Sequence, residues 1–229
     1  NYTGLINKLL PLFFVLLLPC AANAYTIHNG MIGKHKIPEG WSIKCSQTSH
    51  YYFSERMVDV TEFKKIYTKN ALNKIQKIYF CHKLTLSRWG TQSNWARGTY
   101  DWKKGYIFVK IDNNNDVEYI LHHEYSSILM KKYDVGFKSK WSFFNKGKYH
   151  GDYGKNNNYN KQHLKQIQKR GWYRDYSQSS FENDFNIIVG HYFSSWLKRD
   201  LLKSANRNWR INGKLKLIKE WYKTKGLLK

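Results

Sequence analysis

The segment from residue 117 to residue 129 constrains the fold of this chain more than any other, because it combines helical spacing of apolar residues with a carboxylate in their midst. On a helix at about 100° per residue, its apolar side chains form one stripe: Val117, Ile120, Leu121, Tyr125 and Ile128. Glu124 falls in the middle of that stripe. An ionised carboxylate on a buried face is costly unless it is paired, hydrogen-bonded or bound to a metal. The sequence therefore predicts a buried acid with a partner or a raised pKa.

The same segment predicts a metal-binding or acid–base site. In a His-Glu-x-x-His motif, two imidazoles on one helix face hold Zn²⁺ while the Glu activates a bound water. His123 and Glu124 occupy the first two positions, and Ser127 stands where the second imidazole would be. A hydroxyl is a far poorer zinc ligand than an imidazole. A structural Glu held by nearby hydroxyls or backbone groups is the simpler alternative.

Residues 1–24 have the layout of a secretory signal peptide. Lys8 precedes an apolar run at 9–18, and the stretch ends in Ala-Asn-Ala at residue 24. The run is shorter than the roughly 20 apolar residues that cross a bilayer as a helix. We therefore expect cleavage after Ala24, a secreted or periplasmic location, and no transmembrane helix in the mature chain.

The cysteines predict a disulfide, and the absence of several catalytic motifs argues against some classes of enzyme. Cys45 and Cys81 are the two cysteines after residue 24, and in an oxidising compartment such a pair is expected to form a disulfide. That bond would tie the N-terminal segment to a predicted strand. The sequence has no Gly-x-Ser-x-Gly motif, phosphate-binding glycine loop or Cys-x-x-Cys pair. These absences argue against a serine hydrolase, a P-loop enzyme and a cysteine-bound zinc.

The charge is strongly positive, with 39 Lys and Arg against 16 Asp and Glu and a formal net charge of +23. Such an excess favours anionic partners, among them nucleic acid, phospholipid headgroups and acidic envelope polymers. The lysines are spread along the chain, and no nucleic-acid-binding motif is present. We therefore expect no sequence-specific nucleic-acid partner, and a solvated basic surface is the plainer alternative.

Apolar periodicity predicts strands before the Glu124 helix and helices after it. Residues 25–52 show little periodicity, which predicts a loop-rich lead-in. The regular elements expected next are a helix at 58–75, a strand at 76–86 and a hairpin at 98–111. The polar run 112–116 is expected to cap the helix that carries Glu124.

The chain after this helix is expected to be mainly helical. Residues 134–170 form an insertion rich in Lys, Asn and aromatic residues, with at most one short helix at 162–169. Its aromatics argue against disorder, and either line a binding surface or cover the core. Two further helices are expected at 181–202 and 215–222. The length suits a single domain over residues 25–229.

The hairpin, the His123-Glu124 helix and the block from Gly171 to Phe185 together resemble a zinc-binding metallopeptidase family related in pattern to the lethal-factor-like gluzincins. In that family a hairpin precedes the His-Glu-x-x-His helix, then come a Gly-x-x-x-x-Tyr segment and an acidic helix start that supplies the third ligand. The chain is more closely similar to secreted bacterial proteins of unknown activity with His-His-Glu-x-Ser-Ser-Ile-Leu and Glu-Asn-Asp-Phe-Asn blocks. The resemblance implies a zincin-like α+β fold: a small N-terminal sheet, the site helix and a mainly helical C-terminal part.

The resemblance also implies roles for particular residues. Glu124 matches the general base, His123 the first zinc ligand, and Tyr176 the hydroxyl that stabilises the oxyanion. The position of the third ligand falls on Asn183 if the spacing from the tyrosine is kept, or on Glu182 if it slips by one residue.

Other acids and imidazoles nearby are candidates for a rebuilt metal site. Asp184 is the main candidate to join His123 as a ligand, and His122 and His191 are further ones. Each candidate has an ordinary structural alternative: a helix N-terminal charge for Asp184, a partly buried histidine for His191, a surface pair for Glu118 with His122, and a capping box for Ser179 with Glu182.

Three hypotheses of function result. The first is a metallopeptidase-like protein that is no conventional zinc peptidase and binds a peptide or protein in a cleft between the two long helices. The second is an active metal-dependent peptidase with altered ligands and zinc as cofactor. The third is a cationic protein that uses the insertion to bind anionic envelope polymers or headgroups. The first two require His123, Glu124, Tyr176 and Asp184 to converge.

Overall fold

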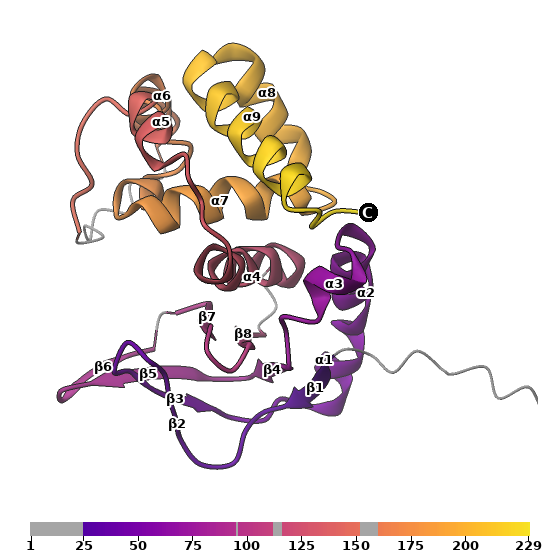
Figure 1. Ribbon diagram of the computed structural model, residues 1–229. Coiled ribbons are helices and arrows are strands. Elements are labelled where there is room, and N and C mark those ends of the chain that lie inside the picture. The colour runs from indigo at the N-terminus through magenta and orange to yellow at the C-terminus, as the bar shows by residue number, and fades with distance from the viewer. Residues whose placement is uncertain (1–24, 95, 112–115, 152–159) are drawn as a thin grey trace, which may run out of the picture.

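The computed structural model describes residues 25–94, 96–111, 116–151 and 160–229. The expected signal peptide, residues 112–115 of the polar run and residues 152–159 of the insertion lie outside the described residues. Two sheets occupy one end of the molecule, helix α4 crosses the middle, and the later helices gather at the other end (Figure 1). The chain is therefore α+β, with strands before α4 and helices after it, as the sequence predicts.

The first sheet separates two hydrophobic cores. Its strands lie in the order β1 (Thr26–Asn29), β4 (Lys77–Cys81), β8 (Tyr106–Lys110) and β7 (Gly98–Asp101). The first three are parallel, and β7 pairs with β8 as an antiparallel hairpin. Side chains alternate along a strand, so β4 and β8 send Ile78, Phe80, Ile107 and Val109 to the helical side and Tyr79 and Phe108 to the second sheet.

The second sheet is antiparallel and covers the opposite face of the first. Its order is β2 (His35–Lys36), β3 (Ser42–Cys45), β5 (Leu84–Arg88) and β6 (Thr91–Ser93). The predicted disulfide between Cys45 and Cys81 is present, and it joins β3 of this sheet to β4 of the first.

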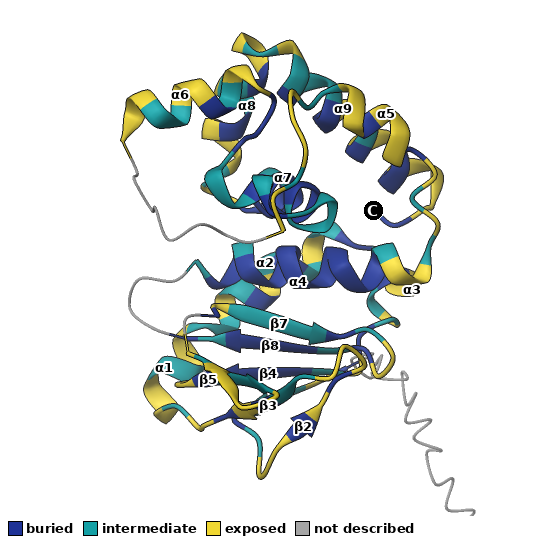
Figure 2. Ribbon diagram, turned by 90° about the vertical axis from the view of Figure 1, so that its left-hand side faces the viewer, coloured by how far each residue is buried: buried dark blue, intermediate teal, exposed yellow. Residues whose placement is uncertain are grey.

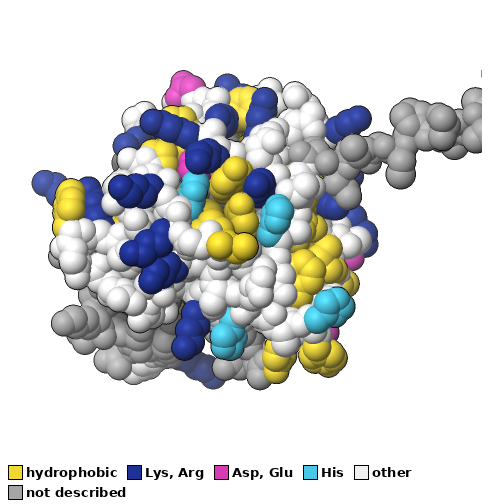
Figure 3. Space-filling view, turned by 90° about the horizontal axis from the view of Figure 1, so that it is seen from below, with side chains coloured by type: hydrophobic (Ala, Val, Ile, Leu, Met, Phe, Trp, Pro, Cys, Tyr) yellow, Lys and Arg dark blue, Asp and Glu magenta, His cyan; other side chains and the backbone are white. Residues whose placement is uncertain are grey.

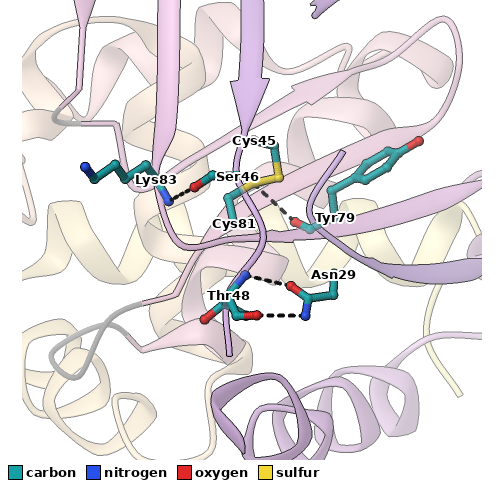
Figure 4. Close-up of a disulfide and its surroundings, with 7 residues drawn as sticks. All are labelled: Asn29, Cys45, Ser46, Thr48, Tyr79, Cys81 and Lys83. Carbon is teal, nitrogen blue, oxygen red and sulfur yellow. Dashed lines mark hydrogen bonds between the residues drawn. A yellow bond between two sulfur atoms is a disulfide. The ribbon is translucent and has the colours of Figure 1, made fainter. Parts of the chain in front are cut away.

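Hydrogen bonds surround the disulfide on both sides (Figure 4). The amide of Asn29 accepts from the Thr48 backbone nitrogen (2.8 Å) and donates to the Thr48 carbonyl (2.9 Å). The backbone nitrogen of Lys83 donates to Ser46 Oγ (2.9 Å). The disulfide therefore sits where the N-terminal segment is already fixed against the end of β4.

Helix α4 (Val117–Lys132) lies between the first sheet and the later helices, and its residues from Val117 to Leu129 are buried except for Tyr119, which is half-buried (Figure 2). The Asp116 side chain caps its first turn by accepting from the Tyr119 backbone nitrogen (3.0 Å). Helix α7 (Phe181–Phe193) packs alongside it. The remaining helical elements are α1 (His50–Glu55), α2 (Met57–Ile66), α3 (Lys69–Leu72), α5 (Lys138–Phe143), α6 (Lys161–Lys169), η1 (Asp175–Gln178), α8 (Lys198–Arg207) and α9 (Trp209–Thr224).

Two predicted helices are broken where a residue turns to extended backbone. The expected helix at 58–75 ends at Tyr67 (φ −99°, ψ 148°), whose backbone bridges to Leu228, and Thr68 then caps α3. The expected helix at 181–202 ends at Ser194 (φ −66°, ψ 130°), whose hydroxyl donates to Asp116 Oδ2 (3.0 Å). In both places a contact with a distant part of the chain overrides the local spacing.

Other predictions of local structure were also wrong. The lead-in at 25–52 contains three strands and the start of a short helix, and the expected strand at 76–86 is two strands that belong to different sheets. The insertion holds α5 in addition to the expected α6. The hairpin at 98–111 and the helix beginning at 117 are confirmed.

Positive charge is distributed over the sheet end of the molecule. Seen from the sheet end, Lys and Arg side chains are spread around a central group of hydrophobic side chains, and acidic ones are few (Figure 3). Among the described residues, no helix has the length and apolar character needed to cross a membrane.

Candidate functional site

The candidate site forms where α4 and α7 lie side by side. The helices are antiparallel, because Asp116 at the start of α4 contacts Ser194 and Lys131 near its end contacts Glu182. Gly190 allows this approach, since a Cβ there would lie 2.6 Å from the ring of Tyr119. We call His123, Glu124 and Ser127 of α4, Glu182 of α7 and Tyr176 of η1 the α4–α7 site.

Glu124 is buried as the apolar stripe predicts, with 8% of its surface exposed. Its side chain packs against β7 at Gly98, where a Cβ would lie 2.7 Å from Glu124 Oε1 and 2.6 Å from the Ile120 side chain. Burial and then the neighbouring Glu182 carboxylate raise the pKa of Glu124 to about 8. The acid is therefore mostly protonated at neutral pH, and its carboxyl group is able to donate a hydrogen bond.

His123 is 9% exposed and neutral at physiological pH. Burial and the positive charge of Arg97 lower its pKa to about 4. The hydroxyl of Tyr119 lies 3.4 Å from its Nδ1, and its ring stacks with Tyr176 at a centroid distance of 6.5 Å. The structure thus brings Tyr176 to the same imidazole that precedes Glu124.

Ser127, which stands where the expected motif would have its second imidazole, bonds directly to Glu182, one of the two residues considered for the third ligand. Ser127 Oγ donates to Glu182 Oε1 (2.8 Å) and accepts from Asn186 Nδ2 (2.6 Å). Tyr100 of β7 donates its hydroxyl to the same Glu182 oxygen (2.6 Å), and Lys131 Nζ lies 3.6 Å from the other. The Glu182 carboxylate therefore has two hydroxyl donors and a cation around it.

Glu182 is free for these contacts because it does not form the expected capping box. The N-cap of α7 is Ser180, one residue later than Ser179, and its hydroxyl accepts from the Asn183 backbone nitrogen (3.0 Å). The hydroxyl of Ser179 donates instead to the Tyr176 carbonyl (2.8 Å). The capping alternative for Glu182 was wrong.

Two members of this network, Tyr100 and Asn186, were missed in the sequence. Tyr100 lies in the predicted hairpin, and Asn186 falls among apolar residues of α7 that face α4. A polar amide inside an apolar helical stripe is the signal that could have identified Asn186, because a buried amide needs hydrogen-bond partners.

His191 lies close to His123 and is also neutral. Its Nδ1 donates to the Ile187 carbonyl (2.8 Å), which leaves the lone pair on Nε2. Its ring meets those of Tyr119 and Tyr173 edge-on at 4.9 and 4.8 Å. Burial, the charge of Arg174 and the nearby His123 lower the pKa of His191 to about 3.

Asp184 does not converge with these residues. Its carboxylate is fully buried and pairs with Lys214 Nζ of α9 (2.5 Å). Trp141 Nε1 of α5 donates to the same oxygen (2.8 Å), and Tyr149 lies 3.2 Å away. The expected convergence therefore fails for Asp184, whose side chain is engaged in a buried ion pair with the insertion and the last helix around it.

His122 also points away from His123. Its Nδ1 lies 2.8 Å from the Tyr67 hydroxyl, and Phe63 and Phe193 pack on its ring. Glu118 accepts hydrogen bonds from the backbone and hydroxyl of Ser195 (2.9 and 2.7 Å). Both residues are buried, so the surface-pair alternative was wrong, because α2 covers this side of α4.

The donor set of the α4–α7 site does not fit zinc in the usual tetrahedral way. It offers one imidazole, a protonated Glu124 and a Glu182 carboxylate already bonded to hydroxyls. Among the residues that the structure describes, no cluster of three or more His, Cys, Asp or Glu could hold a metal ion. The arrangement is suited to hydrogen bonding.

No family model matches this chain, and neither the curated proteins nor the solved structures include a match to it. The residues themselves therefore carry the functional argument.

Proposed function

We propose that this chain is an exported, zincin-like protein whose α4–α7 site binds a peptide or protein ligand and does not act as a conventional zinc peptidase. The bond of 2.8 Å between Ser127 and Glu182 carries the proposal. This bond joins Ser127, at the position of the second ligand, to Glu182, one of the two candidates for the third, whereas a zinc peptidase would bind both residues to the metal.

The charges around the site support the same conclusion. A metal would neutralise Glu182; here the Lys131 cation lies beside the carboxylate, and the hydroxyls of Tyr100 and Ser127 donate hydrogen bonds to it. A general base must also be ionised to accept a proton. With a pKa of about 8, Glu124 is mostly protonated at neutral pH and would donate a hydrogen bond to a ligand carbonyl.

The zincin-like fold is part of this proposal. Four elements follow one another in the order of the peptidase pattern. They are the β7–β8 hairpin, the His123-Glu124 helix, η1 with Tyr176, and a second helix with an acid in its first turn. Glu182 on the second helix reaches Ser127, four positions after His123, and so lies close to the place that a third ligand would occupy.

Restoring the missing imidazole tests the proposal. Ser127→His should bind stoichiometric zinc through His123, the new imidazole and Glu182, whereas the wild type and Ser127→Ala should not. Zinc would be measured by atomic emission after equilibration and gel filtration, with Ser127→His/His123→Ala as the matched control. Because Ser127 is buried, Ser127→Cys provides a smaller ligand if the histidine variant does not fold.

Two results would contradict the proposal. Stoichiometric zinc in the wild type that is lost on His123→Ala would show a working metal site. Folded Ser127→His and Ser127→Cys variants that bind no more zinc than Ser127→Ala would remove the link to the peptidase pattern.

One observation favours the second candidate, a metal-dependent peptidase with altered ligands. The hydrogen bond from His191 Nδ1 to the Ile187 carbonyl keeps the proton on Nδ1 and the lone pair on Nε2. A metal-bound imidazole has the same arrangement, with the other ring nitrogen donating to a carbonyl or carboxylate. On this alternative His191 replaces the missing ligand. Zinc bound by the wild type and lost in both His191→Ala and His123→Ala, together with peptidase activity, would favour it.

A further inference from the structure

Three aromatic rings form an exposed patch at the helical end of the molecule. Phe143 and Phe144 at the end of α5 meet Trp209 at the start of α9, with centroid distances of 5.9 Å to each. Phe143 is 69% exposed and Trp209 is 56% exposed. The junction of α8 and α9 lies far from both sheets (Figure 1). We call Phe143, Phe144, Trp209 and Arg210 the aromatic patch.

The aromatic patch is fixed from beneath. A Cβ at Gly213 of α9 would lie 2.1 Å from the ring of Phe144, so this ring rests directly on the helix backbone. Arg210 stacks over Trp209 at 4.3 Å, and its Nη1 donates to the Phe143 carbonyl (3.3 Å). The two outer rings, Phe143 and Trp209, are therefore held in place while much of their surface is in water. Exposing apolar surface to water is unfavourable, so folding alone does not explain their position.

Basic side chains lie beside these rings. Gly171 packs against Arg210, since a Cβ added at Gly171 would lie 3.5 Å from the Arg210 side chain. The preceding residue, Arg170, donates from Nε to the Lys146 carbonyl (3.1 Å). Lys140 of α5 and Arg207 of α8 are also exposed, and they come shortly before Phe143 and Trp209 in the sequence. The segments 138–148 and 203–213, which hold the patch, contain seven Lys and Arg and no acidic residue. The surroundings of the patch are thus positively charged.

We propose that the aromatic patch docks the protein on the anionic surface of a phospholipid bilayer. Trp and Phe favour the bilayer interface, and Lys and Arg beside them attract anionic headgroups. A soluble acidic polymer would satisfy the charges but would leave the protruding Phe143 in water. A bilayer accommodates both the charges and the apolar rings.

Vesicle sedimentation tests this docking with the full chain. Phosphatidylcholine vesicles with and without phosphatidylglycerol would be compared at low and high salt. Residues 1–24 are the same in every variant, so the readout is how the difference in binding between anionic and neutral vesicles changes from wild type to variant. In Phe143→Ala/Trp209→Ala that difference should fall about tenfold or more, and high salt should reduce it for the wild type.

Trp89 provides a matched control. It is 86% exposed at the β5–β6 turn, with the Arg88 guanidinium stacked on its ring at 3.8 Å, so it presents the same pair of groups at the sheet end. Trp89→Ala should leave the anionic preference unchanged. Hydrogen exchange with anionic vesicles should show protection at 138–146 and 207–213, and none at 84–93.

Several outcomes would overturn the docking. One is a folded double variant that keeps the wild-type preference, and another is an equal loss in Trp89→Ala. Equal binding of wild type to neutral and anionic vesicles would also refute it. Polyglutamate is a further probe: if it binds the wild type, and if the double variant loses this binding as strongly as it loses vesicle binding, the partner is an acidic polymer and not a bilayer.

Discussion

Replacing Glu124 by Gln should stabilise the folded protein, increasingly so as the pH rises. Burial and Glu182 raise the pKa of Glu124 from 4.5 to about 8. The folded state thus keeps a proton that the unfolded chain releases above pH 4.5. The stability that this carboxyl contributes is complete below pH 4.5 and is lost as the pH rises through about 8. Gln has nearly the same shape and no charge to lose.

The magnitude follows from the pKa difference. Each pH unit between the two values corresponds to about 1.4 kcal/mol, so Glu124 costs the wild type about 3 kcal/mol at pH 7 and about 5 kcal/mol above pH 8. His123 and His191 act in the opposite direction. Their pKa values are lowered to about 4 and about 3, so the stability they contribute is present above pH 6.5 and lost as the pH falls through those values. Both histidines are present in wild type and variant, so the difference isolates Glu124.

Urea unfolding followed by tryptophan fluorescence from pH 5 to pH 8 would measure this difference. We expect the advantage of Glu124→Gln in unfolding free energy to grow by roughly 3 kcal/mol over that range. Glu220→Gln, at an exposed position on α9, is the matched control and should track the wild type. A difference between Glu124→Gln and wild type that stays constant within about 0.5 kcal/mol would refute the buried, protonated acid.

Three further perturbations test other parts of the structure. Cys45→Ser/Cys81→Ser should lower the unfolding free energy by about 4 kcal/mol, because the disulfide spans a sequence separation of 36; guanidinium unfolding would measure this, and an unchanged midpoint would contradict it. Lys214→Met should cost roughly 3–5 kcal/mol by leaving Asp184 buried without its cation, and adding Asp184→Asn should restore most of the loss in a double-mutant cycle. Glu182→Gln should lower the pKa of Glu124 by removing the adjacent negative charge, so the pH dependence of stability should shift to lower pH, and an unshifted profile would exclude that coupling.

The sequence predicts the elements around the site better than the rest of the fold. The apolar stripe locates α4 and the burial of Glu124, and the hairpin before it is confirmed because its strands are adjacent in the chain. The second sheet was missed because its strands are short and pair across long separations, as β3 does with β5. Parallel pairing of β1 with β4 is equally remote in sequence.

The candidate site shows where helical periodicity ceases to be informative. Asp184 and His191 are seven residues apart on one face of α7, yet Asp184 meets Lys214 and His191 meets Tyr119. Periodicity identifies the buried face of a helix, but it does not identify the neighbouring element that covers each turn of that face. Glu182 was misassigned for a related reason, since Ser179 and Ser180 are both competent caps and the choice between them depends on tertiary contacts.

Gly98 has no functional group, yet it governs the chemistry beside it. Strand β7 approaches α4 so closely at this residue that one added methyl group would press on both Glu124 and Ile120. Any substitution there would push the strand away from the helix and let water reach the acid. The acid would then ionise at lower pH, so a change of a single carbon on a neighbouring strand would retune the site as effectively as a change of the acid itself.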